Sequence, residues 1–237
     1  GFTIGSSCLQ ETRPIIGAAA SLRAVMPELA MAFESKHGVR APEVTYGASG
    51  TLAKQIQAGA PLSALVLASA TDMNELTHAG LIARGSHTVI ATNRLVLAGR
   101  VGDAPDPLQF LTKNPNSRIA MGDPRFVPAG AHAQEALQAR GVWDRVAPRT
   151  IFTRDVTAAV ALLRRGEVDW AFIYDTDVRL HEELEVVERF EDPETRRPTV
   201  ITGSAPGSQE VQAFLTFLSG SRASEILRAH GFQVDPQ

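Results

Sequence analysis

Cysteine is nearly absent from this sequence of 237 residues, since Cys8 is the only one. A single cysteine excludes a disulfide framework within the chain, and the six histidines are too dispersed to pair at the spacing of zinc ligands. We therefore expect neither a bound metal cation nor a cofactor.

An excess of positive charge is also missing. The chain has 23 lysines and arginines against 26 aspartates and glutamates, for a net charge of −3 at pH 7. Because the basic residues are scattered rather than clustered, the sequence argues against a nucleic-acid partner and favours a small ligand.

Long hydrophobic runs are missing too, and none approaches the roughly 20 residues of a membrane-spanning helix. The beginning lacks the regions of a signal peptide, so we expect a chain that is either mature or not exported. Residues 1–12 are interpreted as a tail. Its segment Gly5-Ser6-Ser7-Cys8 resembles the end of a lipoprotein signal, although Gly5 stands where an aliphatic residue is usual. Lipid anchoring at Cys8 and a free thiol both stay open.

What the sequence does have is an alternation of apolar runs and helical periods, which predicts β-α-β units in an α/β fold with mostly parallel sheets. A first series predicts three strand–helix pairs, at residues 13–17 and 22–37, 43–46 and 51–58, and 64–67 and 72–79. Pro27 falls inside the first helix and is expected to bend it.

A second series follows the strands predicted at 89–92 and 95–98, between which we place a lobe boundary near residue 92. Its predicted elements are strands at 118–121, 150–153 and 170–174 and helices at 129–140 and 156–164. The charged segment 181–197 is interpreted as a solvated excursion. A strand at 199–202 and helices at 208–218 and 221–230 complete the chain. One large α/β unit and two lobes both fit this length.

Small residues stand at several strand-to-helix junctions. Ser21 follows Ala18-Ala19-Ala20, and Ser49 lies in Gly47-Ala48-Ser49-Gly50-Thr51. The start of a helix leaves backbone N–H groups unpaired and carries a partial positive charge, so two such junctions together favour an anion site. Taken singly, each serine is more simply explained as an N-cap.

The second series offers three further candidates. Ala129 and Val156 stand at helix starts, where they can offer a ligand only a backbone N–H. Tyr174 ends a predicted strand, at the edge where α/β clefts bind ligands. Plain helix starts and a half-buried tyrosine bonded to backbone are the alternatives. Tyr46, inside a strand, is expected in the core.

Charged residues near these motifs are interpreted mainly as solvated or local. Lys54, Arg125 and Arg154 could steer an anion, but charges in such places usually face solvent. We interpret Asp123 and Asp155 as turn or capping carboxylates that point away from the cleft.

Together these motifs resemble the periplasmic molybdate-binding proteins, the substrate-binding subunits of molybdate ABC importers. The resemblance runs from about Ile15 to Phe232. Four segments carry it: Ala-Ala-Ala-Ser-Leu at 18–22, Thr-Leu-Ala-Lys-Gln-Ile-Gln-Ala-Gly-Ala-Pro at 51–61, Gly-Asp-Pro-x-x-Val-Pro-Ala-Gly at 122–130, and Ala-x-x-Ile-Leu-x-x-x-Gly-Phe at 223–232.

The resemblance implies a two-lobed type II periplasmic-binding-protein fold that holds a tetrahedral oxyanion between the lobes. We expect one lobe from 13–92 with 200–237, another from 93–199, and a hinge near 90–94 and 197–203. The family's ligand set falls on Ser21 and Ser49 through hydroxyl and backbone N–H, on Ala129 and Val156 through backbone N–H, and on the Tyr174 phenol.

The same resemblance implies a monomeric periplasmic protein that is not an enzyme, binds molybdate or tungstate, and docks on a membrane permease. Two positions depart from the family, because Ser63 and Ser69 replace its usual aspartates. They are outside the ligand set, so we expect altered bonding near the site or hinge first, and then a shift in affinity or ligand.

Neutral donors alone suit a fully deprotonated dianion. Hydrogen phosphate would bring a proton that finds no acceptor, at a cost of about 1–3 kcal/mol. We expect closure by population shift, since donors from both lobes meet the anion only when the lobes shut.

Three rivals remain. A serine hydrolase using Ser49 lacks the G-x-S-x-G elbow and a histidine in a motif that requires it. The second alternative is the ligand-sensing domain of a transcriptional regulator, but these residues contain no helix-turn-helix. The third keeps the fold and binds sulfate, another oxyanion or a small carboxylate.

Overall fold

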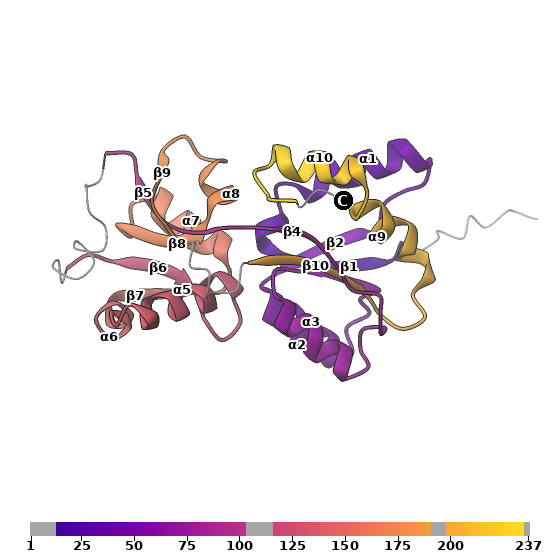
Figure 1. Cartoon of the computed structure of the whole chain (residues 1–237), viewed down its shortest axis with the longest axis horizontal. Coiled ribbons are helices and arrows are strands. Elements are labelled where there is room, and N and C mark those ends of the chain that lie inside the picture. The colour runs from indigo at the N-terminus through magenta and orange to yellow at the C-terminus, as the bar shows by residue number, and fades with distance from the viewer. Residues whose placement is uncertain (1–12, 103–115, 191–197, 235–237) are drawn as a thin grey trace, which may run out of the picture.

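Two five-stranded sheets, each flanked by helices, make up the computed structural model, which describes residues 13–102, 116–190 and 198–234 (Figure 1). The first sheet has the strand order β2-β1-β3-β10-β4, and the second has the order β7-β6-β8-β5-β9. We call each sheet with its helices a lobe. The α/β class and the two lobes agree with the sequence expectations.

The first lobe combines the early part of the chain with its end. Its strands are β1 (Ile15–Ala19), β2 (Glu43–Gly47), β3 (Ala64–Leu67), β4 (Thr88–Thr92) and β10 (Thr199–Ser204). Its helices are the short 3₁₀ turns η1 (Ala20–Leu22) and η3 (Gln209–Val211), with α1 (Met26–His37), α2 (Ser49–Gln57), α3 (Ala70–His78), α9 (Gln212–Leu218) and α10 (Ser221–Ala229). Helices α2 and α3 cover one face of the sheet, and α1, α9 and α10 cover the other (Figure 1).

The second lobe is built from the middle of the chain. Its strands are β5 (Leu95–Arg100), β6 (Ile119–Gly122), β7 (Thr150–Thr153), β8 (Trp170–Tyr174) and β9 (Leu184–Phe190). Its helices are α5 (Pro128–Ala139), α6 (Trp143–Val146), η2 (Ala147–Arg149), α7 (Val156–Arg164) and α8 (Asp175–Val178).

Both sheets are mixed, with as many antiparallel as parallel strand pairs, whereas the sequence predicted mostly parallel sheets. In the first, β1 pairs in parallel with β2 and β3, while β10 runs antiparallel to β3 and β4. In the second, β6 pairs in parallel with β7 and β8, while β5 runs antiparallel to β8 and β9. In parallel βα units the helices begin at the carboxyl edge of the sheet, so several helix N-termini gather at that edge.

Strand β3 shows how sequence sets the core. All four of its residues are fully buried, which is why the run is apolar rather than alternating. Ala64 and Val66 join the cluster that packs under α1, α9 and α10, while Leu65 and Leu67 join the cluster under α2 and α3. The two-residue period of a strand thus supplies both faces of the sheet at once.

The chain crosses between the lobes at Asn93 and Arg94, which join β4 to β5. The Asn93 N–H donates to the carbonyl of Pro198, 2.8 Å away, so this crossing is bonded to the chain entering β10. The Asn93 side chain is buried and donates to the Thr176 hydroxyl at 2.9 Å. These bonds tie the crossing to both lobes.

The predicted bend at Pro27 is wrong. The helix begins at Met26 rather than Leu22, which puts Pro27 in its first turn, where no helical hydrogen bond is lost. The 3₁₀ turn η1 occupies part of the segment that we expected to continue the helix.

The solvated excursion predicted at 181–197 is also wrong where the structure describes it, because β9 pairs there with β5. Residues 191–197 lie outside the described part, as do Cys8 and the tail 1–12. The short helices α6 and α8 were not predicted. Within the described residues, no helix has the length and apolar character needed to cross a membrane.

Candidate functional site

All five candidate residues line one small cavity between the lobes, of about 10 Å³. The first lobe contributes the junctions after β1, β2 and β3, and the second lobe contributes the starts of α5 and α7 and the end of β8. The lining residues are Ala19, Ala20, Ser21, Ala48, Ser49, Ala68, Val127, Pro128, Ala129, Asp155, Val156 and Tyr174.

Ser49 is the first residue of α2 and is completely buried. Its hydroxyl does not cap the helix. It accepts instead from the backbone N–H of Ala68 at the end of β3, at 2.9 Å. The Ser49 oxygen is the acceptor in this bond, so the hydroxyl hydrogen stays available to donate to a ligand in the cavity. Nothing in the sequence indicated the bond from the Ala68 amide.

Ser21 lies within η1 and is partly buried. The N-cap of η1 is Ala19, and that of α1 is Val25, neither with a side-chain capping bond. The capping role considered for Ser21 is therefore wrong, because the 3₁₀ turn separates this serine from the long helix.

The second lobe supplies backbone N–H groups at two helix starts. Pro128 is the first residue of α5 and has no N–H, so Ala129 carries the first amide of that helix. Val156 is the first residue of α7. Amides in the first turn have no carbonyl partner within their helix, and the helix dipole gives them a partial positive charge.

Two glycines allow this junction to form. A side chain on Gly130 would collide with the carbonyl oxygen of Gly122, and one on Gly122 would collide with Val127. The glycines of the Gly-Asp-Pro-x-x-Val-Pro-Ala-Gly motif thus let the start of α5 return against the end of β6. This packing brings Ala129 to the cavity.

Tyr174 ends β8 and is buried, and its hydroxyl has no hydrogen-bond partner among the residues that the structure describes. Burial, reinforced by the charge of Asp177, raises the pKa of this phenol well above its ordinary value. The hydroxyl therefore stays protonated and can donate to a ligand in the cavity.

Asp177 is the functional neighbour that sequence reasoning missed. Its carboxylate accepts from the Tyr174 N–H at 2.9 Å and is buried. Burial raises the pKa of Asp177 to about 7, although the bond from the Tyr174 amide acts against this rise. Its position three residues after Tyr174 was the available signal, but only the fold shows the bond.

The two aspartates near the site make local bonds. Asp123 bonds to Arg125, which lowers the pKa of this carboxyl. Asp155 caps α7, as expected, by accepting from the Ala158 N–H at 2.8 Å. The prediction that Asp155 lies away from the cleft is wrong, because this residue lines the cavity. Among the lining residues, all of them described, none is a lysine or arginine.

Lys54 and Tyr46 each take part in a cation–π contact outside the cavity. The Lys54 ammonium lies 4.1 Å from the centre of the Phe126 ring, outside the cavity lining. Tyr46 is only partly buried, because β2 is an edge strand, and the Arg23 guanidinium lies 4.5 Å from its ring centre. The prediction of a core position for Tyr46 is wrong.

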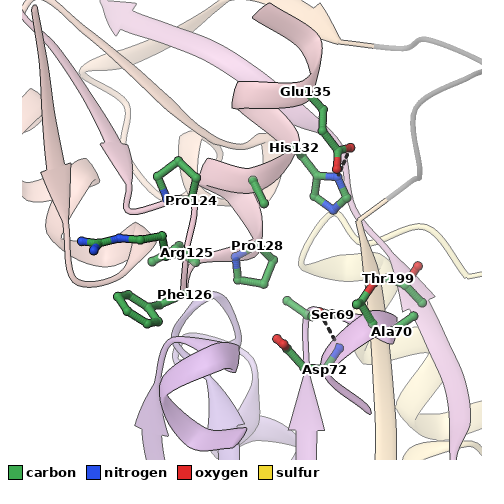
Figure 2. A pocket seen from close by; sticks show the side chains of 14 residues that line it. Ser69, Ala70, Asp72, Pro124, Arg125, Phe126, Pro128, His132, Glu135 and Thr199 are labelled. Carbon is green, nitrogen blue, oxygen red and sulfur yellow. Dashed lines mark hydrogen bonds and ion pairs between the residues drawn. The ribbon is translucent and has the colours of Figure 1, made fainter. Parts of the chain in front are cut away.

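A groove of about 550 Å³ lies beside the cavity and shares Ala68, Val127 and Pro128 with it (Figure 2). Ser69, one of the two departures from the family pattern, is at its edge and caps α3 by accepting from the Asp72 N–H at 3.1 Å. Ser63 is linked through its backbone, to Ile15 and to Ala205. Ser69 thus performs a capping task that an aspartate also performs.

Several known proteins are similar to this chain along nearly their whole length. The molybdate-binding protein ModA of Escherichia coli (strain K12) is 29% identical over 97% of this chain and 92% of its own. ModA of Haemophilus influenzae is 28% identical over 98% of this chain and 94% of its own.

The fold is matched by a solved structure, the periplasmic molybdate-binding protein of Azotobacter vinelandii, with a TM-score of 0.82 at 22% identity, over 94% of this chain and 100% of that one. The likeness shows the two-lobed type II binding-protein architecture. A family model described as bacterial extracellular solute-binding protein matches residues 15–233, and the chain therefore belongs to that family.

Proposed function

We propose that this protein binds molybdate or tungstate in the cavity between its lobes and delivers the anion to an ABC importer. The observation that carries the proposal is the Tyr174 hydroxyl, a buried donor without a partner in the described part of the chain. A buried polar group of this kind costs free energy until a ligand pairs with it. Its placement opposite Ser49 supports a ligand that accepts from both lobes.

The donor set favours a fully deprotonated anion. Ser49 has one of its two lone pairs occupied and its hydrogen available, Tyr174 is held protonated, and Ala129 and Val156 offer amides. Each oxygen of a tetrahedral dianion can accept from such groups. Hydrogen phosphate would have to donate its own proton, and leaving that donor unpaired costs about 1–3 kcal/mol.

The cavity of about 10 Å³ has room for about one water molecule, so any anion requires its lining residues or the lobes to move apart. A compact tetrahedral ion needs less movement than an organic skeleton, which favours an inorganic anion over a small carboxylate. Sulfate shares the charge and shape of molybdate, so it is an outcome that the experiment below distinguishes.

The remaining assignments rest on the relatives. Similar proteins that are described as periplasmic or as part of a molybdenum ABC transporter support a periplasmic protein that meets a membrane permease. That the protein acts as a monomer stays a proposal. We place the lobe boundaries at 13–92 with 200–237 and at 93–199, in keeping with the two sheets, and the hinge near 90–94 and 197–203. Lipid anchoring through Cys8 stays a proposal, as does the absence of catalysis.

Isothermal titration tests the proposal. Purified protein, dialysed free of anions, is titrated with molybdate, tungstate, sulfate and phosphate, beside the variants Ser49→Ala and Ser208→Ala, the latter a serine outside the cavity. The proposal expects tight binding of the first two anions, weakened only by Ser49→Ala. Tight binding of sulfate with weak molybdate would transfer the function to the sulfate alternative.

A further inference from the structure

The loop that leads into α5 reaches across to the first lobe. Phe126, three residues before Ala129, accepts through its carbonyl from the Gly50 N–H at 3.0 Å. Gly50 follows Ser49 directly in α2. One backbone hydrogen bond therefore joins the two segments that supply donors from opposite sides of the cavity.

Gly50 has no room for a side chain at this contact. A Cβ atom there would lie 2.9 Å from both Cα and the carbonyl oxygen of Phe126, which are backbone atoms that cannot rotate away. Gly50 does not have a positive φ, so alanine suits its place in α2 and even favours the helix. Gly50 is thus explained by the close approach of the second lobe and not by its own backbone conformation.

The side chain of Phe126 makes a second contact between the lobes. Lys54, one turn after Gly50, holds its ammonium 4.1 Å from the centre of the Phe126 ring. Figure 2 shows Phe126 beside Arg125 in the loop, and the Arg125 guanidinium lies 5.2 Å from the same ring centre. The aromatic ring therefore carries a cation from each lobe.

The loop holds Phe126 in a fixed place. The N–H groups of Phe126 and Val127 both donate to the Asp123 carbonyl, at 3.0 and 2.8 Å. The Asp123 carboxylate is bonded to the backbone N–H of Arg125 at 3.0 Å. Because the turn is closed by its own bonds, the Phe126 carbonyl is oriented before the lobes meet.

We propose that Phe126 is a positioning residue, and that with Gly50 and Lys54 it forms an inter-lobe clasp that aligns Ser49 with Ala129 and slows the release of the bound anion. This inference rests on the proposed function for the identity of the anion. The clasp itself needs no ligand, since all its contacts are between protein groups. It should therefore set how long the lobes stay shut, and leave the preference among anions to the cavity.

Kinetics distinguishes a clasp from ordinary packing. Molybdate association and dissociation rates are measured by stopped-flow tryptophan fluorescence for Lys54→Met, Phe126→Leu and Gly50→Ala. Matched controls are Lys36→Met, at an exposed position of helix α1, and Phe152→Leu, at an exposed position of β7. The clasp predicts a dissociation rate raised about twofold to fivefold by Lys54→Met and about tenfold or more by Gly50→Ala. The molybdate-to-sulfate preference should not change.

A second arm works without any ligand. Small-angle scattering in anion-free buffer should give a larger radius of gyration for Gly50→Ala than for the wild type, with thermal unfolding confirming that the variant is folded. If the wild type binds no molybdate but this expansion is seen, the clasp stands and the proposed function fails. If the wild type binds molybdate while the variants match their controls in both dissociation rate and radius, the clasp is overturned and the function stands.

Discussion

The hydroxyl groups of Ser49 and Tyr174 are both buried, but they differ in their hydrogen bonds. Ser49 is bonded to the Ala68 amide, so it retains one stabilising contact when the cavity holds no ligand. The Tyr174 hydroxyl has no hydrogen-bond partner within residues 13–102, 116–190 and 198–234. The tyrosine therefore bears the larger cost in the ligand-free state and gains more when an anion binds.

Replacing this tyrosine should separate binding from stability. Tyr174→Phe removes the unpaired hydroxyl and keeps the ring, so the ligand-free protein should unfold at an unchanged or slightly higher temperature. Anion affinity should fall about tenfold to a hundredfold, the usual range for losing a hydrogen bond to a charged group. Calorimetry for stability and titration for affinity check the two halves. Equal affinity in wild type and variant would remove Tyr174 from the site.

Asp177 gives the protein a pH dependence of known sign. Its folded-state pKa of about 7 lies above the ordinary carboxyl value of 3.8. Between these values the unfolded chain loses the proton while the folded protein keeps it, so this group's contribution to stability is lost as pH rises toward 7. Asp177→Asn keeps an acceptor for the Tyr174 N–H and cannot ionise.

The free energy of unfolding of Asp177→Asn relative to wild type should therefore increase from pH 4 to pH 8, by roughly 2–4 kcal/mol. Urea unfolding at several pH values measures this difference, and Asp144→Asn, at an exposed position in α6 of the second lobe, controls for general charge effects. A difference that does not vary with pH would show that Asp177 ionises normally.

At the scale of elements, the start of α3 shows what a departure from the family pattern does. Ser69→Ala removes the cap that pairs with the Asp72 N–H and should cost about 1 kcal/mol of stability. Ser69→Asp introduces the residue that the resemblance implied at this position, caps equally well and should change stability by less than about 0.5 kcal/mol. Chemical denaturation measures both. A loss as large for aspartate as for alanine would contradict the capping role.

Elements whose cause is local were predicted closely. Strand β3 and helix α7 have the predicted bounds, because the apolar run and the helical period that cause them lie within the segments themselves. Strand β9 was missed, since its many charged residues suggest a solvated segment. It forms because β5 offers an antiparallel partner, which is information that a segment does not carry in its own sequence.

The same distinction holds for the whole molecule. Helix starts and strand ends can be predicted from local sequence patterns. For this reason five residues could be singled out, and the fold brings all of them to one cavity: Ser21, Ser49, Ala129, Val156 and Tyr174. The Ala68–Ser49 bond and the contact of Gly50 with Phe126 could not be predicted. Each joins segments that are distant in the chain, so only the packed lobes reveal them.

The central claim is that an oxyanion sits in this cavity, held by neutral donors of both lobes. Crystals grown with molybdate and measured at the molybdenum absorption edge test it most directly. We expect a single anomalous peak in the cavity, with oxygens about 3 Å from the Ser49 and Tyr174 hydroxyls and from the Ala129 and Val156 amides. A molybdenum peak elsewhere on the protein, with the cavity free of it, would contradict the account.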